Sequence, residues 1–304
     1  MGQSFWLHAE DNCELYVQHW GSKMRQPKAV IQIAHGMVEH IGRYDAFATY
    51  LNELGYIVYG NDHRGHGHTG DKQGIQGFFG DDNGFELIVG DMYYLTRHIQ
   101  KEHPSLPIFL FGHSMGSFIT RNFLQKYSHE VSGVILSGTG HFSKVSSLAG
   151  KALASFLPAQ KQSSLMNALA FDSYNNKIKN KRTSFDWLTR DEQVVDDYIN
   201  DPLAGYVPTA RFFVDLLSGI LTMQDQTLNR TIRKDLPMLF ISGEADPVGN
   251  FGKGVFRTAN NYTQLGMENI AVLLFPEARH ELLNELNNEE VYKTINQWLQ
   301  EQLD

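Results

Sequence analysis

The sequence predicts an α/β fold in which a mostly parallel sheet is covered by helices on both sides. Short apolar runs rich in β-branched and aromatic residues alternate along the chain with longer segments of helical periodicity. Several of these runs lack polar alternation, which is typical of strands buried on both faces. With 304 residues, of which 42% are hydrophobic, the chain is long enough to bury a large core.

Seven strands and six helices are expected from these patterns. The expected strands are Glu14–Trp20, Ala29–Ala34, Tyr56–Gly60, Ile108–Phe111, Gly133–Leu136, Met238–Ser242 and Ile270–Phe275. The expected helices are Tyr44–Leu54, Phe85–Gln100, Phe118–Lys126, Arg211–Met223, Lys253–Leu265 and Glu289–Leu303. Because most strands are separated by a helix, they should lie parallel to one another.

Residues 141–207 interrupt this alternation, since no strand is expected there. The stretch LAGKALASFL places Leu148, Leu153 and Phe156 on one helical face. We expect a helical cap at 141–207, inserted into a core formed by residues 1–140 and 208–304. The apolar face has two compatible uses. It packs against the core, or it belongs to a lid and either lines an acyl site or touches lipid.

The segment Gly112-His113-Ser114-Met115-Gly116 lies between an expected strand and an expected helix. That context is typical of a nucleophile elbow, in which a strained serine needs small residues two positions away on each side. Ser114 is therefore the predicted nucleophile, and it should project above the carboxyl ends of the strands.

A serine hydroxyl needs a base, and the base needs an orienting carboxylate. In this architecture the acid and then the histidine should follow the serine, each on a loop after a strand. Asp246 in GEADPVG and His280 in PEARHE meet that order. Glu244 and Glu277 are the competing carboxylates.

The oxyanion of the tetrahedral intermediate needs two hydrogen-bond donors. The backbone amide of Met115, directly after the serine, is the first candidate. The second is the amide of Met37, in the loop after the strand AVIQIA, where Gly36 lets the backbone approach the substrate.

Six segments together resemble the monoacylglycerol lipase and lysophospholipase branch of the α/β-hydrolases: HGMVEHIGRY, NDHRGHG, GHSMGS, DDYINDPL, GEADPVG and ARHE. The resemblance covers most of the chain. It implies the α/β-hydrolase fold with a helical cap inserted after its sixth strand, and a serine esterase that needs no metal or other cofactor.

By position, the resemblance implies that Arg43 and Tyr198 surround a glycerol pocket and that Glu39 supports that loop. Gly36 and His113 are expected at the substrate as well. A cap glutamate of some family members falls at Val194 here, beside Glu192 and Gln193, and Ser117 replaces the commoner third glycine of the elbow. These departures leave the head-group preference open.

Composition limits the kinds of partner and the compartment that we expect for the protein. The net charge of −8 argues against nucleic-acid binding, which depends on basic residues. The single cysteine, Cys13, allows no intramolecular disulfide, and no signal peptide or membrane span is apparent. We expect a cytoplasmic monomer or homodimer that contacts membranes or micelles through its cap.

His63, His66 and His68 lack the cysteine or carboxylate partners of a familiar metal site.

The expected function is hydrolysis of a monoacylglycerol or lysophospholipid-like ester through Ser114, His280, Asp246 and an acyl-enzyme. Alternatives within enzymes are an esterase for small or aromatic esters, a thioesterase, an acyltransferase and a peptidase. A dehalogenase or epoxide hydrolase would need Asp in place of Ser114. An alternative of another class is an inert hydrolase fold that binds a ligand.

Overall fold

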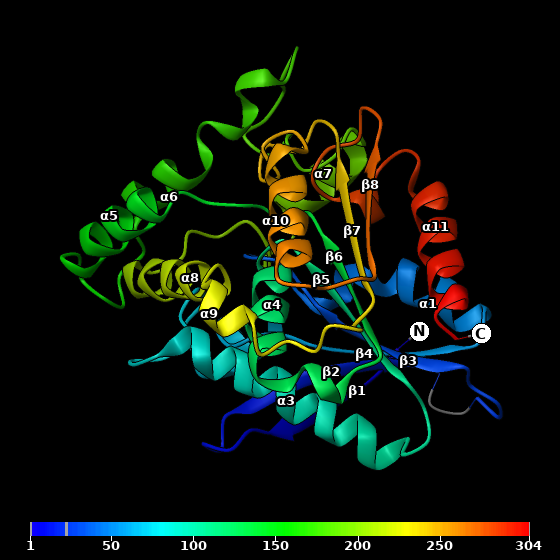
Figure 1. Ribbon diagram of the computed structural model, residues 1–304. Coiled ribbons are helices and arrows are strands. Elements are labelled where there is room, and N and C mark those ends of the chain that lie inside the picture. The colour runs from blue at the N-terminus through cyan, green and yellow to red at the C-terminus, as the bar shows by residue number, and fades with distance from the viewer. Residues whose placement is uncertain (1, 22–23, 304) are drawn as a thin grey trace.

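A computed structural model describes residues 2–21 and 24–303 and contains one eight-stranded sheet (Figure 1). The strands run in the order β1-β2-β4-β3-β5-β6-β7-β8. Strand β2 is antiparallel to both of its neighbours, and the strands from β4 to β8 are parallel. The eight strands are β1 Gln3–His8, β2 Glu14–Trp20, β3 Ala29–Ala34, β4 Tyr56–Asn61, β5 Ile108–His113, β6 Gly133–Ser137, β7 Met238–Gly243 and β8 Ile270–Phe275.

All seven predicted strands are confirmed to within two residues, and β1 was missed. Strand β1 lies at the sheet edge and most of its side chains are exposed or half-buried, so it lacks the apolar run that identifies the inner strands. By contrast, every residue of β3, β4, β5, β6 and β7 is buried.

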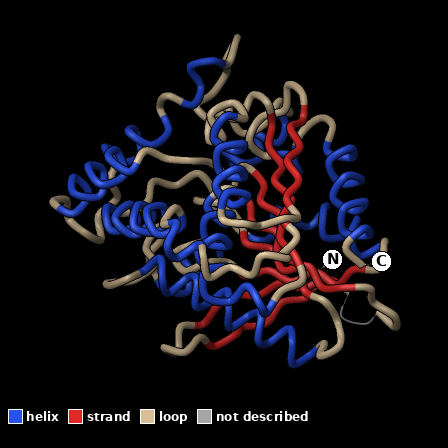
Figure 2. The backbone as a smooth tube through the Cα atoms, viewed as in Figure 1, coloured by secondary structure: helices blue, strands red, loops and turns tan. Residues whose placement is uncertain are grey.

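Helices cover both faces of the sheet (Figure 2). One face packs against α1 (Asp45–Glu53) and α11 (Asn288–Glu301), and the other against α3 (Gly84–Glu102), α4 (Met115–Tyr127) and α10 (Lys253–Gln264). Helix α8 (Ala210–Met223) packs on α3 and α4. Alternate residues of the buried strands serve the two cores: Ile31 and Phe109 point to the first, and Val30 and Leu110 to the second. All six predicted helices are confirmed.

Three helices lie between β6 and α8: α5 (Lys144–Ser155), α6 (Ser164–Phe171) and α7 (Glu192–Asn200). Helices α5 and α6 stand away from the sheet on one side, whereas α7 lies near β7 and β8 (Figure 1). Helix α5 packs against α8. The described residues of this region contain no strand, only an isolated bridge between Gln162 and Thr209. Helix α8 begins after position 207, where the predicted cap ends. The helix that supports α5 therefore belongs to the segment that follows the predicted cap.

The remaining short elements are η1 Ile41–Tyr44, α2 Gly67–Gln73, η2 Ser128–Glu130, η3 Tyr174–Lys177, α9 Gln226–Asn229 and η4 Leu282–Asn284. Helix α2 was not predicted, because its sequence GHTGDKQ contains two glycines and few strong helix formers. Buried Asp62 organises this turn, accepting hydrogen bonds from the amides of His68 at 2.8 Å and Ile41 at 2.8 Å.

Three histidines pack against one another below the carboxyl ends of β3 and β4. The ring of His35 lies 4.1 Å from that of His63 and 5.4 Å from that of His66. Burial lowers the pKa of His63 to about 3 and that of His66 to about 4, and it lowers the pKa of His35 well below its ordinary value. All three are therefore neutral in the folded protein at pH 7.

This cluster predicts an acid-sensitive fold. Below pH 6.5 the unfolded chain protonates these histidines while the folded chain does not, so stability is complete above that pH and falls as the pH drops toward 4. Each histidine should cost about 2 kcal/mol between pH 6.5 and 5. Urea denaturation over this range should show a shallower pH dependence in His66→Asn than in wild type. His8→Gln, which changes an exposed ring, should keep the wild-type dependence.

Candidate active site

Ser114 occupies the sharp turn between β5 and α4, with φ 51° and ψ −118°. A Cβ at Gly116 would lie 2.0 Å from the Ala34 carbonyl oxygen, and one at Gly112 would lie 2.5 Å from Thr120 Oγ1. Only glycine fits at either position. The need for small residues two positions from the serine, predicted from the Gly-x-Ser-x-Gly spacing, therefore has a steric cause. The Ser114 amide donates to the Ser137 carbonyl oxygen at 2.9 Å, which ties the turn to β6.

The structure brings Asp246 and His280 together at the same end of the sheet. His280 Nδ1 lies 3.0 Å from Asp246 Oδ1, and that oxygen also accepts a hydrogen bond from the Val248 amide at 2.8 Å. The Ser242 hydroxyl donates to Asp246 Oδ2 at 3.2 Å. The competing carboxylates are elsewhere: Glu244 is exposed, and Glu277 forms only a surface ion pair.

Charge and burial act against each other in this pair. Burial raises the pKa of Asp246, but the charge and hydrogen bond of His280 outweigh it and hold that pKa below its ordinary value. Burial lowers the pKa of His280, but Asp246 outweighs it and raises the pKa. Asp246 is thus ionised at neutral pH, and His280 is a stronger base than a free imidazole.

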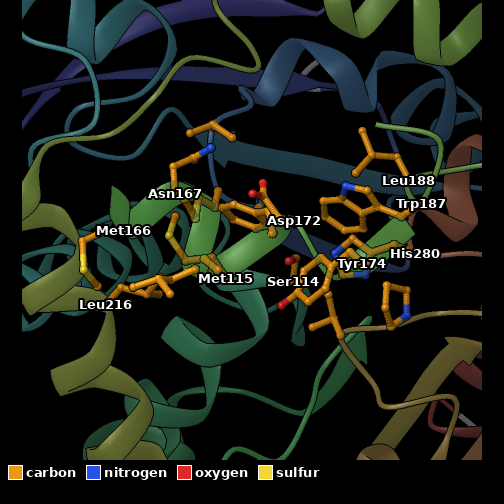
Figure 3. Close-up of a pocket in the computed structure, with 18 of the residues that line it drawn as sticks. Ser114, Met115, Met166, Asn167, Asp172, Tyr174, Trp187, Leu188, Leu216 and His280 are labelled. Atoms are coloured by element: carbon orange, nitrogen blue, oxygen red, sulfur yellow. The ribbon is translucent and has the colours of Figure 1, made fainter. Parts of the chain in front are cut away.

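Ser114 and His280 line the same cavity, which has a volume of about 1420 Å³ (Figure 3). Within the described residues, His280 Nε2 is buried and has no hydrogen-bond partner. Met115, Met166 and Leu216 lie on one side of Ser114 in Figure 3, and Tyr174 and Trp187 lie on the His280 side. The cavity exceeds the usual size of a small-molecule pocket, so it has room for a long apolar group.

The loop after β3 approaches the serine closely. A Cβ at Gly36 would lie 3.3 Å from the Ser114 Cβ and 2.6 Å from Glu39 Oε1. Met37 and Met115 both line the cavity. In the described part of the chain, neither of their backbone amides donates a hydrogen bond to another residue. Both amides therefore have the free donor that an oxyanion site requires.

His113 also lines the cavity, with its ring centroid 4.7 Å from that of His280. Burial, reinforced by the neighbouring His280, lowers the pKa of His113 to about 3. A second positive charge is therefore absent beside His280 at neutral pH. Ser117, which replaces a glycine of the family pattern, donates to the Ser114 carbonyl oxygen at 2.6 Å and so reinforces the turn.

Arg43 joins the loop after β3 to the loop that carries His280. Its guanidinium donates to both oxygens of Glu281 at 2.7 Å and to Glu39 Oε2 at 2.8 Å. Glu39 in turn accepts from the Gly36 amide at 2.5 Å and from the Tyr44 hydroxyl at 2.8 Å. A charged network thus ties the two loops together, and its carboxylate residues Glu39 and Glu281 line the cavity.

Arg43 does not line the cavity, which differs from its predicted place at the substrate. The two carboxylates use its donors, and its guanidinium lies 4.8 Å from the centre of the Tyr198 ring. Tyr198 does line the cavity, but its hydroxyl donates to the Val38 carbonyl oxygen at 3.1 Å. Residues 192–194, where the family pattern changes, do not reach the cavity.

The two carboxylates of this network differ in their electrostatics. Although burial raises the pKa of Glu281, the charge and hydrogen bonds of Arg43 outweigh it and lower the pKa to about 2. Burial raises the pKa of Glu39 above its ordinary value despite the same arginine. Glu281 is therefore the firmly ionised partner of Arg43.

Sequence reasoning missed Glu281, Trp187 and Tyr174. Glu281 directly follows the predicted base, His280, in the motif ARHE. Its place in that motif could have identified it as a site residue. The two aromatic residues come from the segment between α6 and α7, which has no regular periodicity. Across residues 2–21 and 24–303, no group of three His, Cys, Asp or Glu is placed to hold a metal ion.

A family model described as Hydrolase_4, serine aminopeptidase S33, matches residues 25–287. The chain belongs to this family. Rat monoglyceride lipase is 28% identical over 91% of this chain and 86% of its own length, and a monoacylglycerol lipase from Mycolicibacterium smegmatis is 28% identical over 90% and 88%. A thermostable carboxyl esterase from Bacillus coagulans, solved in complex with glycerol, superposes with a TM-score of 0.92 at 27% identity and covers 100% of this chain and 99% of its own.

These matches confirm the predicted α/β-hydrolase fold and the predicted resemblance. The protein is an enzyme of the serine esterase and lipase type, similar to monoglyceride lipases. The family description names a peptidase while these relatives are named lipases and an esterase, so membership alone does not fix the substrate. No helix in the described part of the chain has the length and apolar character needed to cross a membrane.

The network of Arg43, Glu39 and Glu281 predicts that Glu281→Gln impairs both folding and catalysis. Loss of one buried charge should lower the free energy of unfolding by about 1–3 kcal/mol. Because Glu281 adjoins His280, the variant should also lower kcat by about tenfold or more through misplacement of the imidazole. Urea denaturation and ester hydrolysis would measure the two effects. Glu289→Gln, in the exposed pair with Lys293, is the matched control and should change neither.

Proposed function

We propose that the protein hydrolyses esters of a single long acyl chain, of the monoacylglycerol or lysophospholipid type, through a covalent acyl-enzyme. The observation that carries this proposal is the pairing of His280 with Asp246 at 3.0 Å beside Ser114 in one large, mostly apolar cavity. In support, a solved relative binds glycerol, and other relatives are named monoglyceride lipases and a phospholipase.

In the proposed mechanism, His280 Nε2 takes the proton from the Ser114 hydroxyl as its oxygen attacks the ester carbonyl carbon. The backbone amides of Met37 and Met115 donate to the resulting oxyanion. His280 then passes the proton to the leaving alcohol, and the acyl group stays on Ser114. A water molecule, deprotonated by His280, releases the fatty acid and restores the serine.

Asp246 fixes the imidazole orientation and stabilises its protonated form. Gly36 and His113 form the wall around the reacting carbonyl. We assign Arg43 and Glu39 a positioning role through Glu281 and the Gly36 amide, and Tyr198 a role in holding the loop at Val38. None of these steps uses a metal or another cofactor.

Residues 141–207 are proposed to act as the cap that forms the acyl tunnel. Leu153, Met166 and Phe171 from this segment line the cavity. Each buried methylene contributes about 0.8 kcal/mol, so each carbon added to the acyl chain should raise kcat/KM roughly fourfold until the tunnel is full.

Hydrolysis of p-nitrophenyl esters from acetate to palmitate, by wild type and Ser114→Ala, tests the proposal. Activity should peak at medium or long chains and fall by at least about 10⁴ in kcat in the variant. Activity confined to acetate and butyrate would sink the lipase assignment in favour of a small-ester esterase. Activity that survives in Ser114→Ala would show that another group is the nucleophile.

The cap also has the apolar surface expected of a lipid contact. Of the large hydrophobic side chains that are exposed in the described residues, half belong to its first two helices and their flanks: Val145, Leu148, Leu153, Phe156, Leu165 and Leu169. We propose that this surface touches membranes or micelles that carry the substrate.

Phe156→Ser tests the lipid contact, because this side chain is 88% exposed and does not line the cavity. Binding to phosphatidylcholine vesicles, followed by sedimentation, should weaken by about tenfold on loss of the aromatic ring. Phe256→Ser is the matched control, since Phe256 is 53% exposed on α10. Equal binding by wild type and both variants would exclude a membrane contact through this surface.

A further inference from the structure

Tyr174 places a free hydroxyl group in the cavity. It begins η3 in the segment between α6 and α7, and it lines the cavity. Among the described residues its hydroxyl has no hydrogen-bond partner. The ring is held edge-on against Trp187, with centroids 4.9 Å apart at 71°, and the next residue, Asn175, donates to the Thr183 carbonyl oxygen at 2.8 Å. The hydroxyl is thus presented from a fixed position.

The ring lies on the side of the cavity that a leaving alcohol must occupy. His280 has to reach the leaving oxygen to protonate it, so the alcohol must lie beside the imidazole. Trp187 packs against both rings, 5.0 Å from His280 and 4.9 Å from Tyr174. Figure 3 places Tyr174 on the His280 side of Ser114, opposite Met166 and Leu216, where an acyl chain would pack.

The other tyrosine hydroxyls at the cavity are already engaged. Tyr198 donates to the Val38 carbonyl oxygen at 3.1 Å, and Tyr206 donates to the Gly65 carbonyl oxygen at 2.8 Å. Arg43, another polar residue predicted for head-group binding, is bound by two carboxylates. Burial and the charge of Asp246 raise the pKa of Tyr174 above its ordinary value, so its hydroxyl stays protonated and can donate.

We propose that Tyr174 is a specificity-determining residue that hydrogen-bonds a second hydroxyl group on the leaving alcohol. This inference rests on the proposed ester hydrolysis and narrows its substrate class. The enzyme selects esters of polyols, such as glycerol with a free neighbouring hydroxyl, over esters of simple alkyl alcohols. A monoacylglycerol and a lysophospholipid share this chemistry.

A matched pair of substrates tests the assignment with the full chain. 2-Hydroxyethyl laurate and propyl laurate have the same acyl group and nearly the same shape, but only the first has a second hydroxyl. Tyr174→Phe keeps the ring packing and removes only the phenolic oxygen. It should lower kcat/KM for 2-hydroxyethyl laurate by about three- to tenfold and leave that for propyl laurate unchanged.

Tyr206→Phe is the control, because it removes a cavity hydroxyl that is already bound to the backbone. It should leave the ratio of the two kcat/KM values at its wild-type level. An equal loss on both esters in Tyr174→Phe would mean a purely structural role and would overturn the proposal, as would no loss on either. Failure of wild type to hydrolyse both esters would instead overturn the proposed function.

Discussion

The buried guanidinium of Arg43 is the interaction on which the active site depends. It connects two loops that are more than two hundred residues apart in the chain, one carrying the candidate oxyanion amide of Met37 and the other carrying His280. The pairing of a buried charge with two carboxylates tolerates little change in geometry, because each ion has lost its water. The position of the loop at Gly36 relative to His280 therefore depends on this ion network as well as on the sheet.

The sheet makes its own contribution by delivering these loops to one edge. Strands β3, β5, β7 and β8 are parallel, so the loops after them emerge together, although they come from distant parts of the sequence. The glycines around Ser114 and at Gly36 then allow contacts that a single additional carbon would prevent. The chemistry of the site thus depends on close backbone packing, to which the side chains add charge.

The elements that sequence could predict are those governed by local rules. Buried strands, amphipathic helices and the elbow spacing each have a pattern that is read within a few residues, and the order Ser114, Asp246, His280 follows from topology. Edge strand β1 and helix α2 were missed because tertiary contacts specify them, through pairing with β2 and through Asp62. Glu281 and Tyr174 required the structure, since their roles come from what they do or do not contact across the fold. Likewise, the head-group role predicted for Arg43 changed once its donors were seen to be bound.

The cap is attached to the core unevenly. Its later part is fastened to the loop of His280 by backbone bonds from His280 to Trp187 and from Glu281 to Leu188, and Arg279 donates to the carbonyl oxygens of Asp186 and Thr189. In its earlier part, α5 packs against α8. Substitutions in α5 and α6 therefore alter the cavity wall without touching the bonds that hold the loop of His280. In evolutionary terms, one side of the cavity can diverge while the contacts around His280 are kept.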